Sequence, residues 1–84
     1  MTSQLPRFTI YSKPGCHLCD RAKAVLERCR DRAGINFSIE EVDISQDAEL
    51  TSRYGHEIPV IILDGREIGR HFLREQQVLE VLAS

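Results

Sequence analysis

Two cysteines separated by two residues, Cys16 and Cys19, are the residues whose types and spacing point most directly to chemistry. On a helix this spacing places both side chains on one face, close enough to close a short disulfide ring. A thiolate on the first cysteine can attack a disulfide of another molecule, and the second cysteine can then resolve the mixed disulfide. The pair therefore indicates either thiol–disulfide exchange or metal binding.

A zinc site is the main chemical alternative for such a pair. Structural zinc normally takes four ligands, often from a second Cys-x-x-Cys or from paired histidines. The remaining candidate ligands, Cys29, His56 and His71, have no such spacing. We therefore favour thiol–disulfide exchange, with a metal or iron–sulfur binding module and a non-catalytic interaction module as the two alternatives.

The third cysteine, Cys29, is predicted to be a core residue. It follows Cys19 by ten residues, which is about 15 Å along a helix and too far for a disulfide. It also falls among apolar residues at helical spacing, where a free cysteine behaves as a small hydrophobic side chain.

Length, composition and charge exclude several classes of protein. A chain of 84 residues, 42% of them apolar, has room for a single domain over residues 1–84. The net charge of −2 gives no reason to expect nucleic-acid binding. No apolar run approaches the roughly 20 residues of a membrane span, and residues 1–7 lack the apolar core of a signal peptide. We therefore expect a cytoplasmic protein that binds neither nucleic acid nor membranes.

The elements on either side of the cysteine pair must position it. Alternation of Phe8 and Ile10 predicts a strand over residues 7–12, which is followed by a break at residues 13–15. Helical spacing predicts a helix from His17 to about Ala33, ended by Gly34. The apolar stripe of this helix is predicted to comprise Leu18, Ala22, Val25, Leu26, Cys29 and Ala33.

Cys16 is predicted to lie at the junction between this strand and this helix. Unpaired peptide N–H groups and the positive end of the helix dipole favour a thiolate at such a position. They can lower the pKa of a cysteine from about 8.5 into the range of about 3.5–7.5. Lys13 would add a second positive charge near the thiolate, so Cys16 is the predicted nucleophile and the more protected Cys19 the resolving thiol.

The second half of the chain predicts two more strands and two more helices. Residues 37–44 are typical of a strand. Their alternation of apolar and polar residues changes phase between Ile39 and Val42, which indicates either a bulge or burial on both faces near the end of the strand. Ser45 is the expected cap of a short helix through Tyr54 that ends at Gly55.

A hairpin and a final helix complete the predicted elements. A dense apolar strand over residues 60–63 follows Pro59, Asp64-Gly65 is a two-residue hairpin signal, and residues 66–69 return antiparallel. The last helix, from about Arg74, is expected to turn Val78, Leu79 and Leu82 inward. The order β-α-β-α-β-β-α predicts an α/β fold with one parallel strand pair and an antiparallel edge.

The segment Tyr11-Ser12-Lys13-Pro14-Gly15-Cys16-His17-Leu18-Cys19, together with Ile58-Pro59-Val60 and the Asp64-Gly65 hairpin, resembles a dithiol glutaredoxin-like protein of the thioredoxin superfamily. The resemblance covers about residues 6–83 and is strongest to a compact glutaredoxin-like branch. It implies a thioredoxin fold, with three helices around a four-stranded mixed sheet in which the second strand lies at one edge, followed by the first, third and fourth. A monomer is the default for this fold.

The same resemblance implies a dithiol–disulfide oxidoreductase that uses Cys16 and Cys19 as its catalytic residues. It also implies a cis peptide between Ile58 and Pro59, facing the cysteine pair. The Ile58 backbone would then bind an extended substrate, so that Lys13, Ile58 and Pro59 are the implied substrate-binding residues.

The chain departs from the pattern of glutaredoxins that use glutathione. Glu57 and Ile58 precede Pro59 where that pattern has Thr-Val, and Arg70 replaces the second glycine of a Gly-Gly that an aspartate should follow. Lys13 is the cationic position that matches, and Arg53 is a looser candidate. We expect no tightly bound cofactor, a protein or small molecule with a disulfide as substrate, and either a thioredoxin-type partner or glutathione as reductant, with glutathione in doubt.

Overall fold

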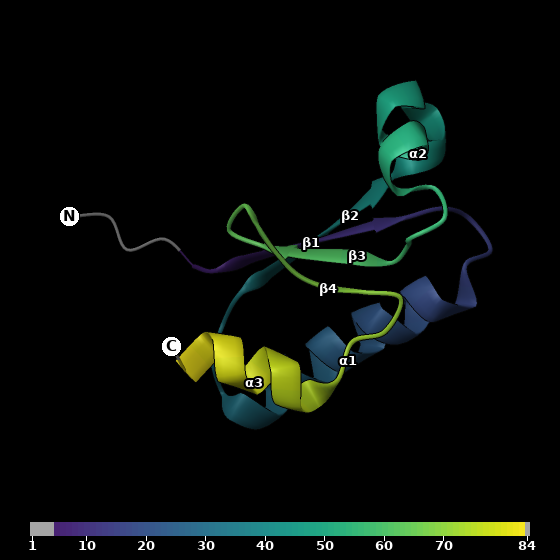
Figure 1. Ribbon diagram of the computed structural model, residues 1–84. Coiled ribbons are helices and arrows are strands. Elements are labelled where there is room, and N and C mark those ends of the chain that lie inside the picture. The colour runs from purple at the N-terminus through teal and green to yellow at the C-terminus, as the bar shows by residue number, and fades with distance from the viewer. Residues whose placement is uncertain (1–4, 84) are drawn as a thin grey trace.

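Four strands form a mixed sheet, with three α-helices beside it, in the part of the chain that the structure describes, residues 5–83. This computed structural model is shown in Figure 1. In chain order the elements are β1 (Arg7–Ser12), α1 (His17–Ala33), β2 (Ser38–Asp43), the 3-10 helix η1 (Ile44–Gln46), α2 (Ala48–Tyr54), β3 (Val60–Leu63), β4 (Arg66–Arg70) and α3 (Glu75–Ala83).

The sheet has the strand order β2-β1-β3-β4, as expected for a thioredoxin fold. β1 pairs parallel with β2 and antiparallel with β3, and β4 pairs antiparallel with β3. The bulge considered for the second strand is absent, since β2 pairs without interruption and ends in two half-buried residues, Val42 and Asp43. The irregularity lies instead between Ile61 and Ile62, where Ile68 of β4 is the extra residue.

The main core lies between the sheet and the helices α1 and α3, which cover one face (Figure 1). β1 alternates along its length, so that Phe8 and Ile10 turn completely inward. The buried members of this core are Phe8, Ile10, Ala22, Leu26, Cys29, Phe37, Ile61, Leu73 and Val78.

Two leucines and Ala33, which helical spacing predicted to face this core, are exposed instead. Leu18 and Leu79 keep 39% and 44% of their surface accessible. Leu18 lies in the first turn of α1, outside the set of residues that pack in the main core. In α3, Val78 fills the core and Val81 and Leu82 pack beside it, so the inward face excludes Leu79.

A second, smaller core joins α2 to the end of the sheet that leads into α1. Its buried members are Cys19, Ile44 and Ile58, and Tyr11, Cys16, Leu50 and Tyr54 pack against them. The ring of Tyr11 stacks on that of Tyr54, with 5.0 Å between ring centroids. Both cysteines of the pair therefore belong to this second core.

The cap of α2 differs from the prediction. The Asp47 carboxylate accepts the Leu50 N–H at 3.0 Å, whereas Ser45 donates its own N–H and hydroxyl to Asp43. The reason is that the chain first makes the 3-10 turn η1, which moves the start of α2 to Ala48. The helix ends before Gly55, as predicted.

The predicted hairpin joins β3 to β4. Asp64 and Gly65 have φ angles of 48° and 88°, and a two-residue turn of type I′ requires positive φ at both positions. Asp64 also accepts the Arg7 N–H at 3.0 Å, which ties the turn to the start of β1.

Between residues 5 and 83, no helix combines the length and the apolar character that a membrane span requires. The expectation that residues 1–7 form no signal peptide falls mostly outside the described residues.

Candidate functional site

Cys16 and Cys19 form a disulfide at the N-terminus of α1, with 5.2 Å between their Cα atoms. Cys16 is the N-cap of the helix. Its Sγ accepts the Cys19 N–H at 3.1 Å, and its carbonyl oxygen accepts the Asp20 N–H at 3.1 Å. The strand–helix junction thus brings the two predicted cysteines together and aims a helix N–H group at the first sulfur.

The two sulfur atoms differ in how far they are buried. Cys16 is half-buried, whereas Cys19 keeps 1% of its surface accessible and packs among Ile44 and Ile58. A sulfur atom of another molecule can therefore approach Cys16 from solvent, while Cys19 is shielded behind it.

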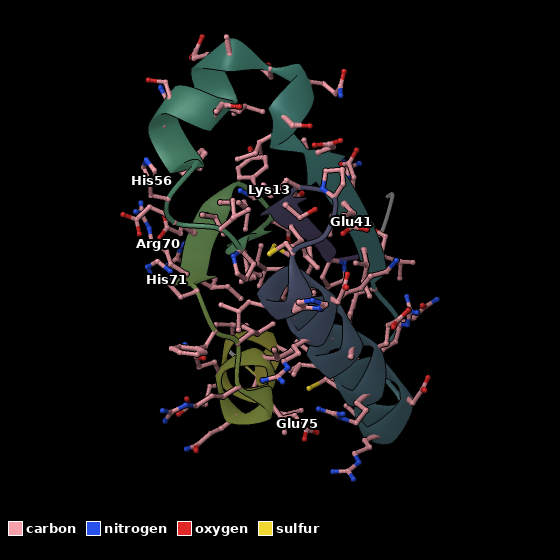
Figure 2. All side chains as sticks on the ribbon, turned by 90° about the vertical axis from the view of Figure 1, so that its right-hand side faces the viewer. Lys13, Glu41, His56, Arg70, His71 and Glu75 are labelled. Atoms are coloured by element: carbon pink, nitrogen blue, oxygen red, sulfur yellow. A yellow bond between two sulfur atoms is a disulfide. The ribbon has the colours of Figure 1, made fainter. Side chains whose placement is uncertain are left out.

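The turn before α1 places Lys13 beside the disulfide (Figure 2). The Cys16 N–H donates to the Lys13 carbonyl oxygen at 3.3 Å, and Gly15 takes a φ of 77° that other residues rarely adopt. A hollow next to this turn is lined, among the described residues, by Lys13 and by the acidic residues Asp20, Glu41 and Asp43.

Glu41 is held in place at this hollow by two contacts. The hydroxyl of the buried Ser12 donates to Glu41 at 3.0 Å, and the Lys23 ammonium lies 3.7 Å from the same carboxylate. Because Lys13 shares the hollow with these carboxylates, its positive charge near the disulfide is partly offset.

The peptide bond between Ile58 and Pro59 is cis, as the resemblance implied. Ile58 packs in the second core with Cys19, and the ladder of β3 begins two residues later at Val60, which lies opposite Tyr11. The Pro59 carbonyl accepts the His71 N–H at 2.8 Å. The Ile58 backbone thus lies beside the cysteine pair and outside the strand pairing.

A cluster of charged side chains beside this peptide was missed by the sequence analysis. The Glu57 carboxylate lies 2.8 Å from His71 Nε2 and 3.8 Å from Arg70 Nη1. Arg70 also hydrogen-bonds Glu67 at 3.0 Å, which lowers the pKa of that carboxyl. Figure 2 shows Arg70 and His71 together on the β4 side of the molecule.

The signal for this cluster was present in the hairpin. A two-residue turn at Asp64-Gly65 brings the end of β4 back to the start of β3, and the extra residue Ile68 sets Arg70 opposite Val60. The hairpin therefore predicts that β4 returns near Glu57, but the pairing of Glu57 with Arg70 also depends on this irregularity.

Arg53, the other predicted cation, lies on α2 and pairs with Glu49 at 3.7 Å. Of the three residues considered for zinc, Cys29 belongs to the main core, His71 binds Glu57 and His56 lies in the turn after α2. In the described part of the chain, no three His, Cys, Asp or Glu side chains come close enough to hold a metal ion.

Cys29 is buried, and its Sγ lies 3.8 Å from the carbonyl oxygen of Glu75. Burial raises the pKa of the Cys29 thiol, and the nearby Glu75 carboxylate raises it further. This cysteine therefore stays a protonated thiol in the folded protein at neutral pH.

In the reduced, folded protein we expect iodoacetamide to alkylate Cys16 much faster than Cys29. Cys16 is accessible and caps a helix, whereas Cys29 is buried and has a raised pKa. Mass spectrometry of the labelled peptides over time measures both rates. In urea-unfolded protein the two rates should converge, and fast labelling of Cys29 in the folded protein would contradict this assignment.

Comparison with known proteins identifies relatives along nearly the whole chain. Residues 7–83 match the model of the Glutaredoxin-like domain (DUF836). Protein XcR50 from X. campestris is 31% identical in sequence to this chain. The match to its X-ray structure covers 90% of this chain and 95% of the XcR50 chain, with a TM-score of 0.74.

Two more distant solved structures share the fold. Protein Ne2328 from Nitrosomonas europaea is 22% identical, with coverage of 96% of this chain and 95% of its own and a TM-score of 0.77. Thioredoxin-2 of the malaria parasite is 15% identical, and the match covers 99% of this chain and 85% of the thioredoxin-2 chain, with a TM-score of 0.69. The predicted thioredoxin fold is confirmed.

Proposed function

Because the chain belongs to the glutaredoxin-like family of the thioredoxin superfamily, we propose that it is a dithiol–disulfide oxidoreductase that works through Cys16 and Cys19. The observation that carries the proposal is the asymmetry of this pair. The two cysteines form a disulfide in which the first is accessible and the second is shielded. Such an arrangement suits an attacking thiol and a resolving thiol.

The reaction proceeds by two thiol–disulfide exchanges. In the reduced protein, the Cys16 thiolate attacks one sulfur of a substrate disulfide, forms a mixed disulfide and releases the other substrate sulfur as a thiol. The Cys19 thiolate then attacks Cys16 Sγ and releases the second substrate thiol. The substrate gains two electrons and two protons, and the pair is left as the Cys16–Cys19 disulfide. A reducing dithiol, or two monothiols, restores it.

The N-terminus of α1 supports the first step. The Cys19 N–H points at Cys16 Sγ, and the positive end of the helix dipole favours a negative charge there. Both effects stabilise the thiolate that attacks, and both also make Cys16 a better leaving group when the pair is reduced again. Lys13 contributes less, because carboxylates share its hollow.

The backbone of Ile58 would hold an extended segment of the substrate next to Cys16. It lies beside the pair and outside the ladder of β3, so its N–H and C=O groups can pair with the backbone of another chain. Pro59, which follows Ile58, and Lys13, which precedes the cysteine pair, are the other two proposed substrate-binding residues.

The charged cluster favours a protein dithiol over glutathione as the reductant. Glutathione carries two carboxylates, and the Glu57 carboxylate next to Ile58 repels them. Arg70 is already bound to Glu57 and Glu67, and it stands where the glutathione pattern has a glycine. A thioredoxin-type partner in the cytoplasm is therefore the proposed source of electrons, and no tightly bound cofactor is needed.

A redox titration of the Cys16–Cys19 pair tests the function. Protein equilibrated in thiol buffers of defined potential is quenched with acid, alkylated and analysed by mass spectrometry. We expect a midpoint between about −270 and −180 mV, the range of thioredoxins, glutaredoxins and disulfide isomerases. A Cys29→Ala variant should give the same midpoint. If no intramolecular disulfide forms at any potential, the proposal is wrong.

A further inference from the structure

A groove runs along α1 from Leu18, which precedes Cys19, to Arg28. It lies between α1 and the segment that joins β4 to α3 (Figure 2). Its apolar surface includes Leu18, Val25 and Phe72. Leu18 and Phe72 are 39% and 67% exposed, so two large apolar side chains face solvent at the edge of the site.

The charged side chains that line this groove are basic. They are the guanidinium groups of Arg21 and Arg28; His71 also lines the groove and is paired with Glu57, and no carboxylate is among the described residues of the lining. Arg21 has no ion-pair partner within residues 5–83. Arg28 lies 3.8 Å from Glu75, but that carboxylate also binds Arg32 at 3.4 Å, so two guanidinium groups share one carboxylate.

The two sides of the disulfide therefore differ in charge. The hollow on the other side has three carboxylates and one ammonium group, those of Asp20, Glu41, Asp43 and Lys13. The net charge of the whole chain is −2, so the basic groove runs against the overall balance of charge. A segment that crosses the disulfide meets a negative surface on one side and a positive, apolar surface on the other.

The lining of the groove starts at residues that neighbour the site. Leu18 stands between the two cysteines in sequence, and the His71 N–H is bound to the carbonyl oxygen of Pro59, next to Ile58. A substrate chain bonded to Cys16 and paired with the Ile58 backbone can therefore reach the groove with its neighbouring residues. An apolar side chain would lie on Leu18, Val25 and Phe72.

We propose that this groove docks the protein substrate, and that the docked segment carries acidic residues around an apolar residue, close to the disulfide that is reduced. The proposal rests on the proposed function. Carboxylates of the segment face Arg21 and Arg28, while its apolar residue covers Phe72. Complementary charge speeds the encounter and fixes the direction in which the segment crosses the disulfide.

Two synthetic peptides test the proposal. Each contains the same intramolecular disulfide, flanked by Glu-Phe-Glu in one peptide and by Lys-Phe-Lys in the other. Fully reduced protein is mixed with each peptide in a single turnover, and the rate is divided by the rate with a small neutral disulfide, hydroxyethyl disulfide. We expect the acidic peptide to react about tenfold faster than the basic one at low salt, and the ratio to fall in 0.5 M NaCl.

Two matched variants locate the effect. Arg21→Glu should lower the ratio of acidic to basic rates about tenfold, because it reverses the free positive charge of the groove. Arg66→Glu makes the same change of charge in the β3–β4 hairpin. Figure 1 places this hairpin at the opposite end of the sheet from the N-terminus of α1, so Arg66→Glu should preserve the ratio of acidic to basic rates. Phe72→Ala should lower the normalised rates of both peptides.

The outcomes separate this proposal from the proposed function. Equal rates for the two peptides, or a preference for the basic one, overturn the docking site while reduction of hydroxyethyl disulfide still supports the oxidoreductase. An equal effect of Arg21→Glu and Arg66→Glu also overturns it, because net charge and not the groove would then set the rate. Failure of the reduced protein to react with any of the three disulfides overturns both proposals.

Discussion

Replacing Cys16 with serine should abolish thiol–disulfide exchange, whereas replacing Cys19 with serine should trap the protein on its substrate. Cys16 is the accessible sulfur, and Cys19 is shielded in the second core. Without Cys16 no thiolate reaches the substrate, so we expect turnover to fall by at least about 10³-fold, as on loss of other catalytic nucleophiles. Without Cys19 the first step still occurs, but the mixed disulfide has no intramolecular thiol to resolve it.

Non-reducing electrophoresis and intact-mass spectrometry after reaction with a disulfide substrate measure both outcomes. The Cys19→Ser protein should gain the mass of one substrate thiol on Cys16, and a reducing agent should remove it. Cys29→Ala is the control, because Cys29 belongs to the main core and takes no part in the exchange. A mixed disulfide that accumulates on Cys19 in the Cys16→Ser protein would reverse the assigned roles.

The features of the site that could be predicted from sequence are those with local causes. Cys16 was placed at a helix N-terminus because the strand pattern stops at Ser12 and the helical pattern starts at His17, and the structure has these same bounds. Asp64-Gly65 predicted the hairpin because both residues tolerate positive φ. The cis bond before Pro59 is predicted by the resemblance, since the residues around it taken alone favour an ordinary turn before a strand.

The features that could not be predicted depend on how far one element extends over another. Apolar spacing marks which residues of a helix share a face, but it does not say how wide the buried face is or how far the covering element reaches. Leu79, beside the inward face of α3, and Leu18, in the first turn of α1, are therefore predicted inside and lie outside. The cluster of Glu57, Arg70 and His71 depends on the register of β3 with β4, which includes an irregularity at Ile68. The groove could not be predicted either, because the exposed Leu18 is part of its apolar surface.

Phe8→Ala should lower the free energy of unfolding by about 3–5 kcal/mol, the cost typical of removing a buried phenylalanine. Phe8 is fully buried, its ring contacts that of Phe37 edge-on with 4.8 Å between centroids, and it sits between Ile39 and Leu63 in the sheet. Domains of this kind are stable by only about 5–15 kcal/mol, so the loss is a large part of the total. Urea unfolding followed by circular dichroism should show a lower midpoint with little change in the slope m.

Phe72→Ala is the matched control for this change. It removes the same atoms from a side chain that is 67% exposed, so we expect the free energy of unfolding to change by less than about 0.5 kcal/mol. Equal costs for the two variants would contradict the placement of Phe8 in the core.

Because β1 carries Phe8 at one end and leads into the turn that holds Cys16, redox activity of Phe8→Ala should fall in proportion to its unfolded fraction as urea is raised. The Phe72→Ala protein should still reduce hydroxyethyl disulfide up to the urea midpoint of the unmodified protein, since its lost contact lies in the groove and not in the core that supports the site.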